Sequence, residues 1–122
     1  MVLRAEPSRL VVHGLAAGLV TDIVRLSITF RGPAAAARAD QLTRAALSIS
    51  SNIAEACGRG TVPEFRRFLL YACGSAQETL SQLRVARSLD ESRRGNILRL
   101  ENQVVLVIKM ISRLHDNPPP DR

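Results

Sequence analysis

The sequence predicts an all-α protein, an antiparallel up-down four-helix bundle. Apolar residues recur at spacings of three and four over long stretches, and aromatic residues make up only 3% of the chain. Gly, Pro and capping residues divide it into four helical segments with short turns. Because 122 residues suffice for a single core, we expect one bundle at residues 8–115, a flexible tail at 1–7 and a disordered tail at 116–122.

The first predicted helix begins after an N-cap at Ser8 and ends at the breaker Arg31-Gly32-Pro33. Gly14 and Gly18 each cost it about 1 kcal/mol relative to Ala, and their small size would let a neighbouring helix approach closely. Its expected core face comprises Val12, Leu15, Ala16, Leu19, Val20, Ile23, Leu26, Ser27 and Phe30.

The second predicted helix covers Leu42 to Cys57, and residues 34–39 are either loop or a frayed helix start, with Asp40 as an alternative N-cap. One face is apolar. The opposite face is a polar stripe of Gln41, Arg44, Ser48, Ser51, Asn52, Glu55 and Arg59. Ser and Asn are mediocre helix formers. The stripe is either a solvated face or a face that meets another chain or a ligand, and we favour the second because ordinary exposed faces use more Glu, Lys and Arg.

The third predicted helix runs from Val62 to Leu89, after a turn containing Gly58 and Gly60. Thr61-Val62-Pro63-Glu64 forms a capping box, in which Thr61 caps the helix and Glu64 reaches back. Gly74-Ser75 in its middle predicts a close crossing with another backbone. The expected core face is Phe65, Phe68, Leu69, Ala72, Ala76, Thr79, Leu80, Leu83 and Ala86.

The last predicted helix begins at Asp90 or Ser92. Its expected core residues are Ile97, Leu100, Val104, Val107, Ile108, Ile111 and Leu114. Val105, Leu106 and Met110 widen this apolar stripe beyond what one bundle needs, and a helix that is apolar over most of its circumference is usually buried on more than one side. In a chain this small, self-association would bury it.

The stretch RAALSISSNIAEACGRGTVPEFRRFLLYACGSAQETLSQL resembles the signature of a bacterial four-helix-bundle family encoded in intervening sequences of large-subunit ribosomal RNA genes. Ser50, Ala56 and Thr61 depart from it, standing where that family usually has Pro, Gly and Ser. The resemblance implies a ring-shaped homo-oligomer, with a pentamer as the expected form. The matching residues are Arg44, Ala45, Ala46, Ser48, Ile49, Ser51, Asn52, Ile53, Ala54, Glu55, Gly58, Arg59, Glu64, Phe65, Phe68, Leu69, Ala72, Gly74, Ser75, Gln82 and Leu83.

Several classes of function are disfavoured by the sequence. The two histidines, His13 and His115, lack the Glu-x-x-His spacing of a di-metal bundle, and Cys57 with Cys73 would make an incomplete zinc site. No phosphate loop, nucleophile elbow or carboxylate pair is present. We therefore expect no catalytic residue, metal, cofactor or small-molecule substrate. No apolar run approaches the ~20 residues of a membrane span and no signal core precedes the first helix, so we expect a soluble cytoplasmic protein without a disulfide.

The net charge of +6 favours anionic partners, with nucleic acid first among them. We expect Arg44, Arg59, Arg66 and Arg67 to bind nucleic acid, because a basic helix start has no dipole reason to be basic. A second arginine group surrounds the opposite turn, and the dipole of the third helix explains Arg84 and Arg87 within it. The group comprises Arg84, Arg87, Arg93, Arg94 and Arg99. With few aromatic residues, binding would be dominated by phosphates and sensitive to salt.

The leading hypothesis is therefore a non-catalytic, homo-oligomeric accessory protein that binds RNA or DNA. The alternative is a structural or protein-interaction scaffold whose arginines only keep it in solution, and a third is an enzyme with a site shared between chains. The predicted subunit interface comprises Ser48, Ser51, Asn52, Glu55, Val105 and Leu106.

Overall fold

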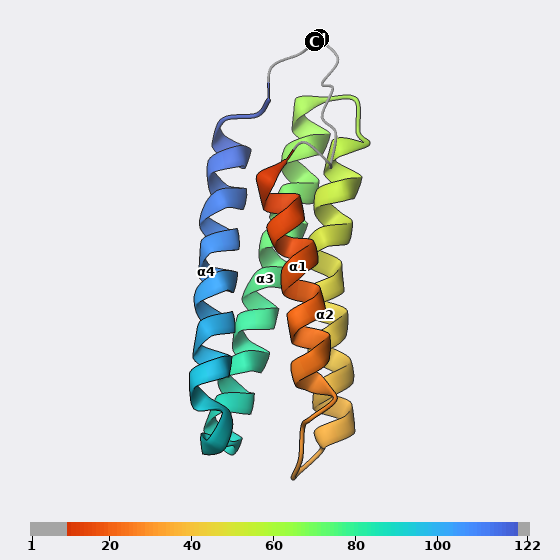
Figure 1. Cartoon of the computed structure of the whole chain (residues 1–122). Helices are drawn as coiled ribbons and strands as arrows, with labels where there is room; N and C mark the ends of the chain where they lie inside the picture. Colours follow the sequence, from red (N-terminus) through yellow and green to blue (C-terminus); the bar gives the residue numbers. More distant parts are fainter. Residues whose placement is uncertain (1–9, 120–122) are drawn as a thin grey trace.

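A computed structural model of the chain describes residues 10–119, and these form an antiparallel bundle of four helices (Figure 1). The helices are α1 (Val11–Ser27), α2 (Ala35–Cys57), α3 (Val62–Leu89) and α4 (Arg94–Asp116), with a 3-10 turn, η2 (Glu91–Arg93), before α4. Each helix packs against its neighbours in the order α1, α2, α3, α4 and back to α1, so α1 and α3 are diagonal, as are α2 and α4. The predicted four helices are confirmed, and the described residues contain no strand.

The core consists of the inward faces of all four helices, filled mainly by Leu, Ile, Val and Ala around a single fully buried aromatic ring, Phe65. Small residues such as Ala46, Ala56, Ala72 and Ala76 face inward on α2 and α3, where they permit close packing of the backbones. None of the helices formed by residues 10–119 is long and apolar enough to cross a membrane.

Helix α1 ends at Ser27, three residues before the predicted end at Phe30. Hydroxyl groups bind two main-chain carbonyls at the end of this helix: Ser27 Oγ donates to Val24 O and Thr29 Oγ1 donates to Leu26 O. Leu15 was expected in the core, but it is 42% exposed. The predicted N-cap Ser8 and the predicted tail at 1–7 lie outside the described residues.

Helix α2 begins at Ala35, so residues 35–41 are helical and Asp40 is not an N-cap. The alanine-rich start has the highest intrinsic helix propensity, which accounts for the earlier beginning. The α1–α2 connection turns through Gly32 and Ala34, both with positive φ. Arg38 holds it closed, because its Nε and Nη2 donate to the carbonyls of Pro33 and Arg31 at 2.8 Å each.

Helix α3 has the predicted bounds. Thr61 Oγ1 accepts a hydrogen bond from the Glu64 amide at 3.4 Å, as half of a capping box requires. The other half is replaced, because the Glu64 carboxylate accepts from Arg67 instead of reaching back. The close crossing predicted at Gly74 is wrong within the described chain, since nothing lies within 4 Å of the position a Cβ would take there.

Helix α4 begins at Arg94, after η2, because Asp90 caps the short turn: its Oδ1 accepts from the Ser92 amide at 3.1 Å. The helix runs to Asp116, one residue into the segment predicted to be a disordered tail. The sequence reasoning missed Glu101, a carboxylate that is only 5% exposed and lies among the core residues of α4.

Candidate nucleic-acid interface

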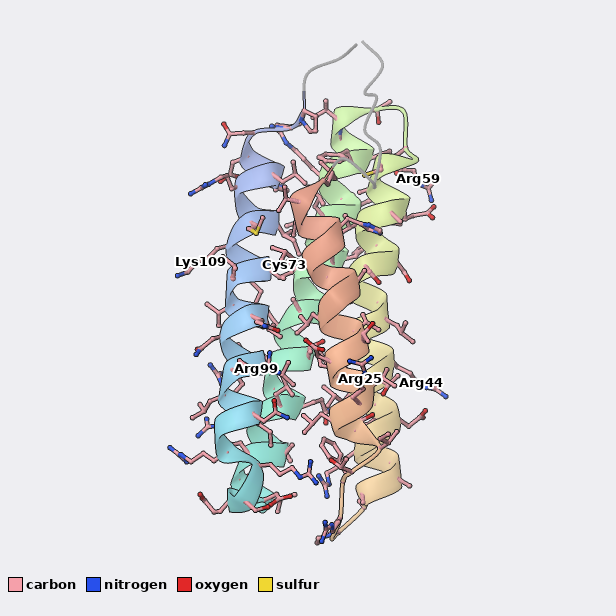
Figure 2. The ribbon with its side chains drawn as sticks, viewed as in Figure 1. Arg25, Arg44, Arg59, Cys73, Arg99 and Lys109 are labelled. Atoms are coloured by element: carbon pink, nitrogen blue, oxygen red, sulfur yellow. The ribbon has the colours of Figure 1, made fainter. Side chains whose placement is uncertain are left out.

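The structure does not bring the four predicted nucleic-acid-binding arginines into one cluster. Arg44 is on α2 and Arg59 lies two residues after the end of that helix, and the thirteen helical residues from Arg44 to Cys57 alone span about 20 Å along its axis. Figure 2 shows Arg59 beside the α2–α3 turn and Arg44 in the opposite half of the bundle, at the height of Arg25. Arg44 pairs with Asp40 at 3.1 Å, with both side chains largely exposed. Of the four predicted arginines, the α2–α3 turn, which we call the hairpin end, therefore holds Arg59, Arg66 and Arg67.

Arg59 and Arg67 share one aromatic ring. Their guanidinium carbons lie 4.4 and 5.1 Å from the centre of the Phe68 ring, and Arg67 also lies 5.9 Å from that of Tyr71. Phe68, expected in the core, is instead partly buried under these two cations. The stack fixes the guanidinium groups at the start of α3 by cation–π attraction.

Each of these two arginines also has a carboxylate partner on its own helix or beside it. Arg59 contacts Glu55 at 2.5 Å and Arg67 contacts Glu64 at 2.7 Å. All four side chains are at least 40% exposed, and such surface pairs contribute about 0–1 kcal/mol. A phosphate could therefore replace either carboxylate at small cost.

Arg66 has a structural task. Its Nε donates to the main-chain oxygen of His115 at 2.9 Å, and this bond ties the start of α3 to the last turn of α4. A carbonyl in that turn has no partner within its own helix. Arg66 consequently differs from Arg59 and Arg67, because removing it would also loosen the bundle.

The polar stripe of α2 is used partly inside the chain. Ser75 Oγ on α3 donates to Ser48 Oγ at 2.9 Å, and Asn52 Nδ2 donates to Ser48 Oγ and to its carbonyl oxygen. Both Ser48 and Asn52 are half-buried, whereas Ser51 and Glu55 are exposed. Of the residues predicted to meet another subunit on α2, Ser51 and Glu55 are thus exposed, Ser48 joins α2 to α3, and Asn52 binds Ser48 within α2.

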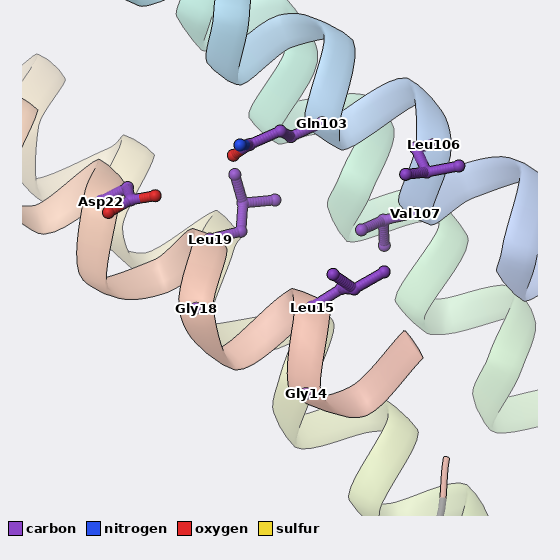
Figure 3. A pocket seen from close by; sticks show the side chains of 8 residues that line it. All are labelled: Gly14, Leu15, Gly18, Leu19, Asp22, Gln103, Leu106 and Val107. Atoms are coloured by element: carbon purple, nitrogen blue, oxygen red, sulfur yellow. The ribbon is translucent and has the colours of Figure 1, made fainter. Parts of the chain in front are cut away.

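The remaining predicted interface residues lie on the other side of the bundle. Val105 is partly buried against the core and Leu106 is 49% exposed. Leu106 lines a groove of about 310 Å³ between α1 and α4, as Figure 3 shows. The other lining residues are Gly14, Leu15, Gly18, Leu19, Asp22, Gln103 and Val107. No helix of the described chain approaches Gly14 or Gly18 closely, because nothing lies within 4 Å of the positions that their Cβ atoms would take.

Glu101 explains part of the second arginine group. Its carboxylate accepts from Arg87 Nε at 2.7 Å and from Arg87 Nη2 at 3.4 Å, and Arg84 Nε lies 3.6 Å away. The sequence reasoning assigned these two arginines to the helix dipole. An acidic residue within an apolar stripe, fourteen positions after an arginine on the preceding helix, was the signal that it missed.

Other reactive groups do not assemble into a site. Cys57 and Cys73 are free thiols, and burial raises the pKa of Cys57 to about 11. Within residues 10–119, no three His, Cys, Asp or Glu side chains come together in a group that could hold a metal ion.

The fold and these surfaces define a small, basic four-helix-bundle protein with stacked arginines at one end. Residues 8–113 match the sequence profile of the 23S rRNA-intervening sequence protein, and the chain belongs to this family. The family resemblance seen in the sequence is thereby confirmed. None of the curated proteins matches the chain. Membership assigns no reaction and no partner.

Proposed function

We propose that this protein is a non-catalytic, homo-oligomeric accessory protein of the cytoplasm that binds RNA or DNA through phosphate contacts. The observation that carries this proposal is the pair of half-exposed guanidinium groups, Arg59 and Arg67, stacked on Phe68 where α3 begins. The N-terminus of a helix favours anions because its amide groups point outward and the dipole is positive there.

The placement of the predicted interface residues supports assembly into a ring. A ring needs two different patches on each subunit, one that meets the preceding copy and one that meets the next. Ser51 and Glu55 are exposed on α2, and Leu106 is exposed on the diagonal helix α4. A ring would also multiply the charge that one nucleic acid meets, which strengthens phosphate binding.

The rival function is a scaffold that binds only protein and uses its arginines for solubility. It is favoured by the groove between α1 and α4, which leaves Leu15 and Leu106 partly exposed. The two functions differ in how they respond to salt and to loss of the stacked arginines. Phosphate binding is weakened by salt and by removal of the arginines, whereas apolar binding is weakened by neither change.

The test is fluorescence anisotropy of labelled RNA and DNA, as duplexes and single strands, titrated with the protein over a series of salt concentrations. We expect a linear fall of log K with log salt that is shared by unrelated sequences. In the double variant R59A/R67A the slope should decrease by roughly 2, about one for each phosphate contact removed, while the oligomer remains intact. Arg66 is left unchanged because it binds the carbonyl of His115.

The control variant is K109A, which removes one positive charge from an exposed position on α4 (Figure 2). It should bind nucleic acid nearly as the wild type does. If the wild-type protein binds no nucleic acid even at low salt, the accessory-protein function is wrong and the scaffold takes its place.

A further inference from the structure

Among the residues that the structure describes, the end of the bundle opposite the hairpin carries more arginines than the hairpin itself. We call it the loop end; it consists of the α1–α2 connection and the α3–α4 connection with the helix turns beside them (Figure 1). Its arginines come from all four helices and both connections. They are Arg25, Arg31, Arg38, Arg44, Arg84, Arg87, Arg93, Arg94 and Arg99.

The two connections lie at the same end of the bundle (Figure 1). A hydrogen bond from the Ser92 hydroxyl holds the pKa of Asp90 below its usual value, and the charges of Arg93 and, least of all, Arg31 lower it further. Arg31 belongs to the α1–α2 connection and Asp90 to the α3–α4 connection, so the charge of one connection acts on the other. On the flank, Arg99 of α4 lies 4.0 Å from Asp22 of α1.

The positive charge at this end exceeds its compensation. Within residues 10–119, nine arginines face six carboxylates in this half of the bundle, an excess of three positive charges, whereas the other half carries five basic groups against three carboxylates. The six carboxylates are Asp22, Asp40, Glu78, Asp90, Glu91 and Glu101, of which only Glu101 is buried.

Structural tasks account for only some of these arginines. Arg84 and Arg87 bind Glu101, Arg38 holds the α1–α2 connection, and Arg25 lies in the last turn of α1, where the dipole favours a cation. Arg31 and Arg94 are different: both are exposed, and they stand before or at the start of α2 and α4, where the dipole disfavours positive charge. Arg94 has Glu91 as a partner, but at 4.0 Å and with the glutamate side chain 77% exposed this pair is weak. An anionic partner would add to the compensation of both arginines.

The shape of the surface fits a nucleic-acid backbone better than a protein helix. A docked amphipathic helix needs a continuous apolar strip. The most exposed apolar residues at this end, Ile28 at 78% and Leu89 at 51%, are at the ends of the diagonal helices α1 and α3. Guanidinium groups distributed over both connections instead match a repeating row of phosphates, which they bind with two hydrogen bonds each. The Phe30 ring is covered by Arg38, 5.1 Å from its centre, and is not offered for base stacking.

We infer that the loop end is a second phosphate-binding surface, one that engages the backbone of RNA or DNA without reading bases and contributes more to binding than the hairpin end. This inference rests on the proposed nucleic-acid-binding function and concerns where on the molecule the phosphates lie. In a chain with basic groups at both ends, one long nucleic acid could contact both surfaces or bridge two copies.

The experiment compares two double variants with the same loss of charge. R31Q/R94Q changes the loop end, and K109Q/R113Q changes exposed residues of α4 in the other half of the bundle. Binding of a labelled RNA duplex, its single strand and the DNA duplex of the same sequence is measured over a salt series. We expect R31Q/R94Q to lower the salt slope by roughly 2 and the affinity at 0.1 M salt on the order of 50-fold, with the control within about threefold of the wild type.

The outcomes separate the location from the function. If the wild type binds and R59A/R67A abolishes binding while R31Q/R94Q has no effect, the loop-end surface is refuted and the proposed function stands. An equal loss in R31Q/R94Q and K109Q/R113Q also refutes it, because net charge alone would then explain binding. Polyglutamate that competes as well as RNA of equal charge would assign the surface to acidic protein. Absence of all binding by the wild type refutes the function itself.

Discussion

The α2–α3 and α1–α4 contacts of the bundle are built in different ways. Between α2 and α3, alanine-rich inner faces are supplemented by hydrogen bonds at the rim, from Ser75 to Ser48 at 2.9 Å and from Gln82 to Gln41 at 3.3 Å. Between α1 and α4, the helices enclose the groove of about 310 Å³. One side of the bundle is thus closed by its own residues and the other is left partly open.

The difference shows which half of the sequence specifies the fold and which half is free for other tasks. Hydrogen bonds between α2 and α3 favour one register of these helices, because each contributes roughly 0.5–1.5 kcal/mol. The exposed apolar groups at the α1–α4 groove make no such bonds. The exposed groove residues Leu15 and Leu106 can therefore change with little loss of stability, unless a second copy of the chain covers them.

The largest expected effect contrasts the same substitution on the two sides. Leu42 of α2 is fully buried, whereas Leu15 of α1 is 42% exposed beside the groove. L42A should lower the free energy of unfolding by about 2–5 kcal/mol because it leaves a cavity. L15A should lower it by less than about 1 kcal/mol, since much of that side chain is already in water.

Denaturant titration at one fixed protein concentration measures both, because association of subunits would make stability depend on concentration. Equal losses in L42A and L15A would mean that the groove is closed in solution. In that event Leu15 would be buried by a neighbouring copy of the chain. The loss of unfolding free energy in L15A should then grow as the protein concentration is raised.

The sequence was sufficient for most of the fold and for little of the interface. Periodicity placed the whole of α3, and the Thr61 cap was predictable because its partner, the Glu64 amide, is local. Helix α2 begins at Ala35, within the stretch for which the sequence allowed either loop or a frayed helix start, because alanine propensity outweighs a cap at Asp40. The pairing of Glu101 with Arg87 was not predictable, since it depends on how α4 packs against α3.

The same reasoning applies to the arginines. Grouping them by position in the chain placed Arg44 with Arg59, although a straight helix separates them. It also divided the loop end, because Arg31 and Arg94 are more than sixty positions apart in the chain. Only the antiparallel packing of α1 with α2 and of α3 with α4 brings those charges to one end (Figure 1).

An intermediate effect is expected at the third contact, between α3 and α4. E101A removes a 5% exposed carboxylate that Arg87 binds with two hydrogen bonds, and it leaves that arginine without its partner. The free energy of unfolding should fall by about 2 kcal/mol. E91A is the control, because Glu91 faces Arg94 at 4.0 Å with its side chain 77% exposed, and its effect should stay within about 0.5 kcal/mol. If E91A lowered the free energy of unfolding as much as E101A does, burial of the Glu101 carboxylate would not be the reason for the effect.

The smallest expected effect tests whether the hydrogen bonds between α2 and α3 stabilise the closed side at all. Ser48 and Ser51 occupy the same helix, and replacing either by Ala gains about 0.5 kcal/mol of helix propensity. Only Ser48 loses hydrogen bonds, to Ser75 and Asn52. S48A should therefore be less stable than S51A by about 1 kcal/mol in denaturant titration. The difference between the two variants cancels the propensity term, so equal stability would mean that alanine packing alone closes this side of the bundle.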